Sequence, residues 1–181
     1  MKIIINQIIA VLFIAFLAVS CENGTSLQRY FVDHQEAKNF ISQDIPISML
    51  KLDASKFNEE EKEAYKSVNR LNFLGYKANE TDAETLHTEL TKVKTILKDK
   101  KYNELIEFSD KGNNIVVKYI GTDTEAEEIV VLGSSKTMGF GIVRVLGHHM
   151  SPDKMVNLVS VLQTANLDEV NLQEIMGFFK Q

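Results

Sequence analysis

The segment from residue 105 to residue 146 constrains the fold of this chain most strongly, because it alternates short apolar runs with turn residues. β-Branched runs of this length, separated by Gly, Asp and Asn, predict strands joined by tight turns. Short connections make neighbouring strands antiparallel. We therefore expect an antiparallel β-meander built from Leu105–Ser109, Ile115–Ile120, Glu127–Leu132 and Phe140–Leu146.

Helical patterns and two more extended segments surround the meander. The stretch 40–50 alternates imperfectly, and its Pro46 predicts an edge or bulged strand. The stretch 71–77 is a second predicted strand. Capping signals and apolar spacing predict helices elsewhere. These begin at Leu27 after Ser26, at Asn58 with Glu61 three residues on, at Thr81 with the stripe Leu86, Leu90, Val93 and Leu97, at Ser151-Pro152, and at Asn171.

These elements together predict an α+β fold. The antiparallel meander would form a twisted sheet, and the helices would pack on one of its faces. Ala64, Tyr65, Val68 and Leu71 follow Asn58 at helical spacing, so the predicted helix there runs up to the strand at 71–77.

The N-terminus carries an apolar run that ends at Cys21, the one cysteine of the chain. Lys2 supplies a charged start, Ile8–Val19 an apolar centre, and Ala18-Val19-Ser20 small residues before the cysteine. This layout predicts a lipoprotein signal peptide that is cleaved before Cys21. Many such motifs place leucine where this chain has Ala18.

Two other interpretations fit the same segment. An uncleaved transmembrane anchor needs ~20 apolar residues, and Ile8–Val19 is shorter, while extension toward Ile3 brings Asn6 and Gln7 into the membrane. The other is an ordinary signal peptide followed by a free thiol. The placement of the single cysteine at the cleavage boundary favours the lipoprotein.

The predicted organisation is a signal peptide at 1–20, a lipidated tether at 21–26 and a single domain at 27–181. Removing residues 1–20 takes away one charged side chain, Lys2, and leaves 19 basic against 25 acidic residues, a net charge of −6. This balance argues against nucleic acid as a partner and against electrostatic binding to anionic lipid. With one cysteine the chain has no internal disulfide, so its core alone must hold the fold.

The adjacent pair His148 and His149 resembles a site more than any other feature. Neighbouring residues of a strand point to opposite faces, so they seldom ligate one metal ion together. His34 and His87 are distant in sequence, and no HExxH spacing is present. We therefore expect a loop pair and no metal site.

Two further segments have structural explanations. Gly133–Thr137 superficially resembles a phosphate-binding loop, but that motif requires glycine directly before the lysine, and Ser135 precedes Lys136. A hairpin turn is the prediction. The acidic run Glu59–Glu61 stands at the start of a predicted helix, where carboxylates favour the positive end of the dipole. We expect no catalytic residues and no cofactor.

The mature chain resembles the small bacterial lipoproteins known as domain of unknown function 4252. The likeness covers roughly residues 27–180, and it implies an envelope location without a known enzymatic activity or catalytic residues. The segments that carry it are 27–33, 39–42, 44–50, 63–65, 93–98, 102–105, 116–119, 139–140 and 144–147.

The expected function is that of a lipid-anchored cell-envelope protein, held by Cys21 in the outer membrane and facing the periplasm or the surface. A non-enzymatic binding or structural role, with an envelope protein as partner, is the leading hypothesis. The alternatives are a lipid-anchored hydrolase with an unrecognised site and an accessory of envelope stress signalling.

Overall fold

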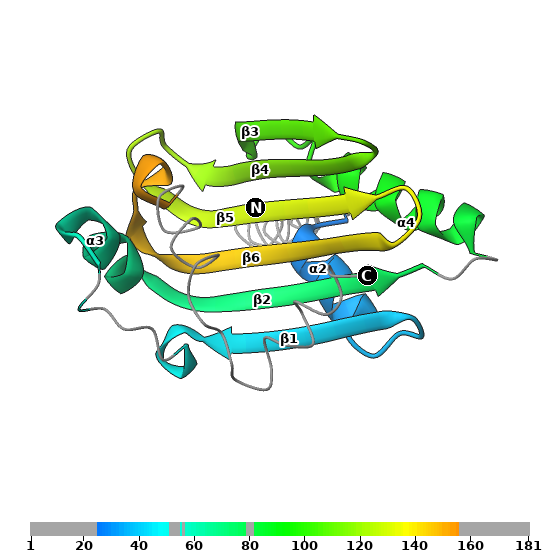
Figure 1. Cartoon of the computed structure of the whole chain (residues 1–181), viewed down its shortest axis with the longest axis horizontal. Helices are drawn as coiled ribbons and strands as arrows, with labels where there is room; N and C mark the ends of the chain where they lie inside the picture. Colours follow the sequence, from blue (N-terminus) through cyan, green and yellow to red (C-terminus); the bar gives the residue numbers. More distant parts are fainter. Residues whose placement is uncertain (1–24, 51–54, 56, 79–81, 156–181) are drawn as a thin grey trace, which may run out of the picture.

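A six-stranded, fully antiparallel sheet forms the centre of the molecule (Figure 1). The computed structural model describes residues 25–50, 55, 57–78 and 82–155. The strand order is β1-β2-β6-β5-β4-β3. The strands are β1 (Phe40–Pro46), β2 (Val68–Lys77), β3 (Asn103–Asp110), β4 (Asn113–Gly121), β5 (Ala126–Ser135) and β6 (Gly139–Met150).

The predicted meander is confirmed, since β3, β4, β5 and β6 pair in sequence order. The β3–β4 turn has positive φ at its two central residues, Lys111 at 47° and Gly112 at 90°, as a type I′ hairpin requires. The other half of the sheet depends on distant pairing. β2 pairs with β6 from Val68↔Gly147 to Lys77↔Gly139, and β1 adds to β2 as the outer strand.

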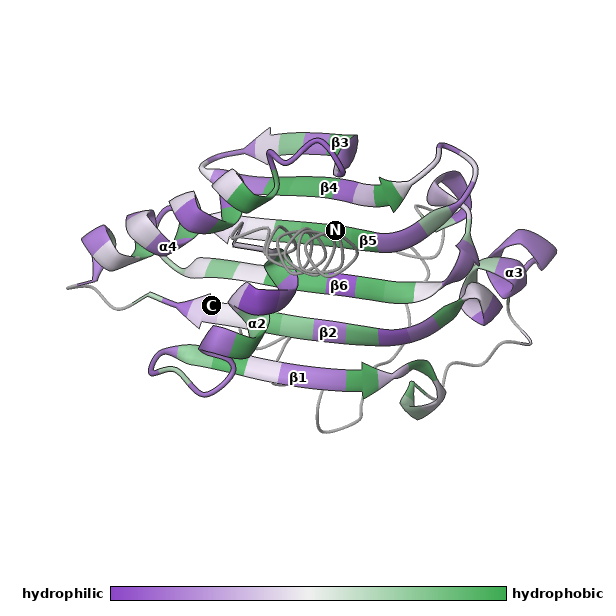
Figure 2. Cartoon of the chain, turned by 180° about the vertical axis from the view of Figure 1, so that it is seen from behind, coloured by the Kyte–Doolittle hydropathy of each residue, from purple (hydrophilic) through white to green (hydrophobic). Residues whose placement is uncertain are grey.

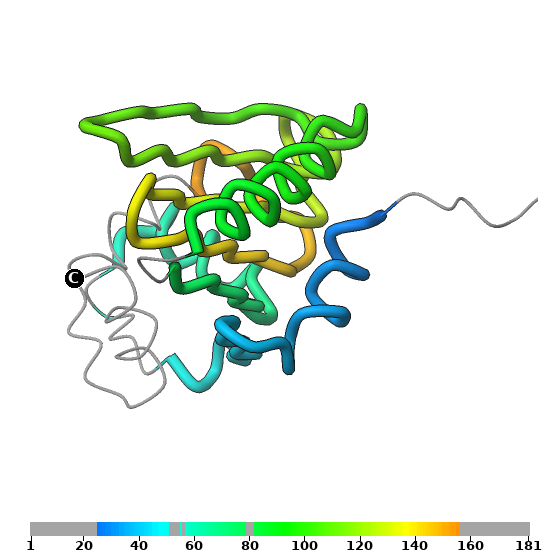
Figure 3. Tube along the Cα trace, turned by 90° about the vertical axis from the view of Figure 1, so that its right-hand side faces the viewer, coloured from blue at the N-terminus to red at the C-terminus, as the bar shows by residue number. Residues whose placement is uncertain are grey.

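Helices α2 (Leu27–His34) and α4 (Ala83–Ile96) cover one face of the sheet (Figure 2), which confirms the predicted α+β class. Seen from the side, the two helices lie next to each other over that face (Figure 3). Together with the strands they bury the larger apolar cluster, whose buried members are Leu27, Tyr30, Phe31, Leu74, Tyr76, Leu86, Val93, Ile96, Leu97, Tyr102, Val130, Leu132, Phe140 and Ile142.

Helix α3 (Glu59–Ser67) lies at one end of the sheet, near the short 3-10 helix η1 (Ile47–Met49) (Figure 1). A second cluster forms on the opposite face, because alternate strand residues point to opposite sides. It contains Phe57, Ala64, Val68, Tyr119, Ala126, Ile129, Val145, Met150 and Met155.

Most predicted helix starts are confirmed, and the structure differs from the prediction at one helix end and one helix start. The Ser26 side chain accepts a hydrogen bond from Arg29 N (3.2 Å), and Asn58 forms a capping box with Glu61. Helix α3 ends at Ser67, earlier than its apolar spacing predicts, because Val68 already pairs with β6. The N-cap of α4 is Asp82, one residue after the predicted Thr81.

Several predictions fall outside the described residues. These are the signal peptide, Cys21, Thr81 and the helix expected from Asn171. The helix predicted at Ser151-Pro152 begins there, with Met155 N donating to Ser151 O (3.0 Å), and can be followed as far as Met155. Within the described ranges, no helix has the length and apolarity needed to cross a membrane.

Candidate functional site

A groove of about 810 Å³ runs between helices α2 and α4 on the helix-covered face. One of its walls comes from α2 and the residue before its cap, and the other from the C-terminal half of α4 and the turn after it. The residues that line it are Thr25, Tyr30, Asp33, His34, Thr91, Lys92, Thr95, Ile96, Lys98 and Asp99.

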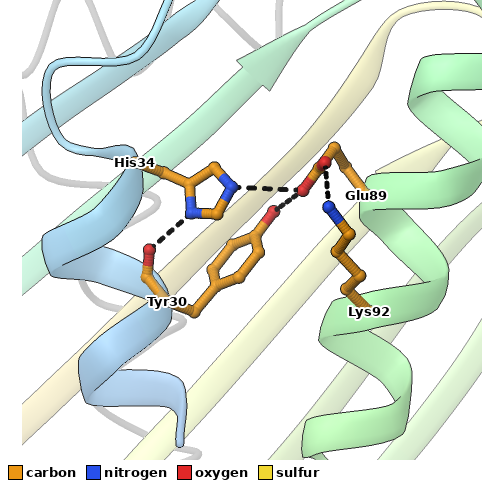
Figure 4. Close-up of polar contacts among 4 residues, drawn as sticks. All are labelled: Tyr30, His34, Glu89 and Lys92. Carbon is orange, nitrogen blue, oxygen red and sulfur yellow. Dashed lines mark hydrogen bonds and ion pairs between the residues drawn. The ribbon is translucent and has the colours of Figure 1, made fainter. Parts of the chain in front are cut away.

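Four polar side chains meet across this groove, with the Glu89 carboxylate at the centre (Figure 4). Tyr30 Oη donates to Glu89 Oε2 at 2.9 Å, and Lys92 Nζ donates to Glu89 Oε1 at 2.6 Å. His34 Nε2 lies 3.3 Å from the same Oε2 atom. We call these residues the Glu89 cluster: Tyr30, His34, Glu89 and Lys92.

Helical spacing explains how each half of the Glu89 cluster forms. Tyr30 and His34 stand at positions i and i+4 on α2, and Glu89 and Lys92 stand at i and i+3 on α4, so each pair shares a helix face. The Tyr30 and His34 rings stack with centroids 4.0 Å apart. His34 Nδ1 donates to the carbonyl oxygen of Tyr30 at 2.8 Å, since a carbonyl can only accept.

Burial and hydrogen bonding set the charge of the central groups. Burial alone would raise the pKa of Glu89, but hydrogen bonds from Lys92 and Tyr30 and the nearby cations outweigh it and lower the pKa. Burial, and then the hydrogen bond to Glu89, raises the pKa of Tyr30 above its usual range. At neutral pH the cluster therefore holds an ionised Glu89 and a protonated Tyr30.

The polar groups of the Glu89 cluster contact one another. Both oxygens of Glu89 accept hydrogen bonds, and each ring nitrogen of His34 faces an oxygen acceptor. The arrangement ties α2 to α4 beside the groove.

A second polar group fixes α2 to the sheet on the same face. Arg144 of β6 is 6% exposed and makes a bidentate ion pair with Glu128 of β5, with Nε–Oε1 at 2.7 Å and Nη2–Oε2 at 2.9 Å. Its other terminal nitrogen donates to the side-chain oxygen of Gln28, and its guanidinium lies 5.3 Å from the Phe31 ring centre. Arg144 thus fixes α2, which forms one wall of the groove, to the sheet.

The histidines singled out in the sequence do not come together. His148 and His149 lie at the exposed end of β6, not in a loop after it, and His149 has a φ of 55° and contacts Glu125 at 2.6 Å. His87 is exposed on α4. Within the described residues, no three His, Cys, Asp or Glu side chains are placed to hold a metal ion.

The hairpin turn predicted at Gly133–Thr137 is present but begins later, because Gly133–Ser135 still pair with β6 and the turn itself occupies residues 136–138. The acidic run Glu59–Glu61 serves the start of α3, as predicted. The sequence did not predict the Glu89 cluster, because the apolar stripe expected to be buried on α4 contains Leu90 and not Glu89. In the structure Glu89 is 9% exposed, and Leu90 is only partly buried.

The molecule is thus an α+β domain with an antiparallel sheet and a groove between two helices on one face. The chain belongs to the family described as a domain of unknown function, DUF4252, which matches residues 30–158. No curated protein and no solved structure matches the chain.

Proposed function

We propose that the chain is a lipid-anchored protein of the cell envelope that acts as a non-enzymatic binding module. Cys21 would carry the lipid in the outer membrane, and the groove between α2 and α4 would receive the partner. Two or three acyl chains, at ~0.8 kcal/mol for each buried methylene, suffice for stable anchoring. The net negative charge of the mature chain argues against general electrostatic attraction to anionic lipid.

The main support for this proposal is the short stretch of chain between Cys21 and the groove. Thr25 lines the groove, and Ser26 already caps α2, whose Leu27 is buried. The four steps from Cys21 to Thr25 span at most about 14 Å when fully extended. A lipid on Cys21 would therefore hold the groove close to the membrane surface, in reach of membrane-bound partners.

The saturated Glu89 cluster supports a binding role over catalysis. The Glu89 carboxylate accepts from Tyr30 and Lys92, and the His34 ring lies between the Tyr30 carbonyl and Glu89, so these side chains serve to join the two helices. The hydrolase alternative rests on the same His34–Glu89 pair. Turnover of generic ester and peptide substrates that disappears in His34→Asn would favour the hydrolase and end the non-enzymatic proposal.

Lipid attachment is tested by metabolic labelling with radioactive palmitate followed by membrane fractionation. The wild-type chain should carry label in the membrane fraction, and Cys21→Ser should carry none. Ser20→Ala is the matched control, because it keeps a small residue before the cysteine and should remain labelled. Label on Cys21→Ser, or none on the wild type, would refute the anchor.

The binding role of the groove is tested by crosslinking in intact membranes. A photoreactive residue at Thr95, which lines the groove, should yield a recurrent adduct. The same residue at Thr122, exposed in the β4–β5 connection, is the control and should not. Equal adducts from both positions, or none from Thr95, would exclude the groove as the binding site.

A further inference from the structure

A second hollow, of about 410 Å³, lies at the end of the sheet where the β3–β4 and β5–β6 turns meet helix α4. Lysines from three separate elements line it: Lys94 of α4, Lys111 of the first turn and Lys136 of the second. One carboxylate, that of Asp110, accompanies them. The residues that complete the lining are Leu90, Ser109, Gly112, Asn113, Asn114, Ser134 and Ser135.

The three lysines have no ion pair with another described residue. Lys62, Lys92, Lys118 and Lys154 each have a carboxylate oxygen within 4 Å. Across the described part of the chain, Lys94, Lys111 and Lys136 have none. Three lysines that line one hollow give it a positive charge, which would attract an anion. The concentration of positive charge is notable in a chain with an acidic balance.

The backbone conformation of the β3–β4 turn places Lys111 at the hollow. Lys111 adopts a φ of 47°, a conformation that asparagine and glycine tolerate better than lysine. The stem of Lys136 lies against the next residue, Gly112, and its Cδ would be 3.5 Å from a Cβ at that position, an ordinary van der Waals contact. The two turns therefore pack together in a way that places Lys111 and Lys136 beside the same hollow.

We propose that this hollow binds an oxyanion, and specifically a phosphate group. Ammonium groups form charge-assisted hydrogen bonds with phosphate oxygens. The hydroxyl of Ser134 and the side-chain amide of Asn114, which lie opposite each other on β5 and β4, add neutral donors. The inference goes beyond the proposed function and does not depend on lipid attachment, because the hollow shares no lining residue with the groove between α2 and α4.

Residue-resolved lysine acylation, read by mass spectrometry, tests the site on the full-length protein in nonionic detergent. Inorganic phosphate should slow the acylation of Lys94, Lys111 and Lys136 together, because a bound ammonium stays protonated and covered. Exposed Lys100, outside the hollow, should react at an unchanged rate. Parallel slowing of all lysines, or none at the three, would overturn the proposal.

Lys111→Asn separates charge from folding, because asparagine suits the positive φ at this position. This variant should raise the phosphate concentration that half-protects Lys136 by about tenfold, the loss expected for one charge-assisted contact. Lys100→Asn removes the same charge outside the hollow and should leave protection of Lys136 unchanged. Equal effects of the two variants would mean general electrostatic attraction and would refute a site.

The phosphate group could belong to a lipid headgroup or to a soluble compound, and the lipid content of the micelle distinguishes the two. Micelles doped with phosphatidylglycerol and free of inorganic phosphate should protect the three lysines if a lipid headgroup fills the hollow. Micelles doped with phosphatidylcholine serve as the control. Protection by inorganic phosphate without protection by phosphatidylglycerol would assign the site to a soluble phosphate compound.

Discussion

Glu89 illustrates how one residue can hold two helices together. Its carboxylate accepts from Tyr30 across the groove and from Lys92 on its own helix, and its side chain is 12% exposed. The Lys92 side chain, by contrast, is 53% exposed. The two partners of Glu89 should therefore differ in what they contribute to stability, since exposed ion pairs are worth little.

Glu89→Ala should lower the free energy of unfolding by about 2–3 kcal/mol, because it leaves the buried hydroxyl of Tyr30 without a partner. Lys92→Ala should cost less than about 1 kcal/mol, because that ammonium is half exposed. Urea denaturation of both variants measures the difference. Equal losses would show that the ion pair with Lys92 within α4 contributes as much stability as the buried hydrogen bond from Tyr30 of α2.

The lowered pKa of Glu89 predicts an acid-dependent loss of stability. The folded state binds this proton less readily than the unfolded chain, so the contribution is complete above the unfolded value of 4.5. It disappears as the pH falls through the lower folded pKa. Urea midpoints of wild type and Glu89→Gln should therefore converge below this range. A constant difference down to strongly acidic pH would contradict the assignment.

At the scale of elements, two glycines with positive φ show how tightly the strands approach. Gly139 opens β6 with a φ of 127°, and a Cβ there would lie 2.0 Å from the carbonyl oxygen of Tyr76. Gly112 has a φ of 90°, but the nearest atom to its Cβ position is Lys136 Cδ at 3.5 Å. Only the first position combines strain with a backbone clash.

Gly139→Ala should therefore destabilise the protein by at least about 2 kcal/mol more than Gly112→Ala. The second variant is the matched control, because both carry the cost of positive φ, about 1–2 kcal/mol. Chemical denaturation of the two variants gives the comparison. Similar losses would mean that the junction of β2 and β6 can relax around an added methyl group.

Predictions of helices and strands were confirmed where they depended on residues close together in the sequence. They were wrong where pairing with a distant strand decided the structure. The hairpins follow from their turn residues, and the start of α3 follows from Asn58 and Glu61. The end of α3 does not, because Val68 continues the helical spacing of Ala64 and Tyr65. Its pairing with Gly147 of β6, far away in the sequence, selects the strand.

At the scale of the whole molecule, burial is distributed unevenly across the sheet. Most residues of β6 from Gly139 to Leu146 are buried, with strands on both sides, whereas nearly all of β3 at the sheet edge is exposed. Local opening costs least where few apolar contacts are broken. Cooperative stability should therefore concentrate in the centre of the sheet.

Hydrogen exchange should show this gradient directly. Amides of β6 and β5 should exchange slowest, and those of β3 facing the sheet edge should exchange fastest among the strands. Mass spectrometry of peptides from the native protein measures both. Protection of β3 equal to that of β6 would reveal a further element or partner covering the edge.

The sequence by itself determined the α+β class, the hairpin order from β3 to β6 and most helix starts, because these depend on residues close together along the chain. It also predicted lipid attachment at Cys21, which lies outside the described residues and stays a prediction. A tight turn is specified by its own residues and does not depend on the rest of the fold.

Only the tertiary structure decided the β2–β6 pairing, the burial of Glu89 and the meeting of three lysines at one end of the sheet. A carboxylate on a helix predicts a solvated position until a donor such as Tyr30 is placed opposite it. Likewise, Lys94, Lys111 and Lys136 are ordinary surface charges in the sequence. Packing of α4 against the sheet brings them together, and no local pattern records that contact.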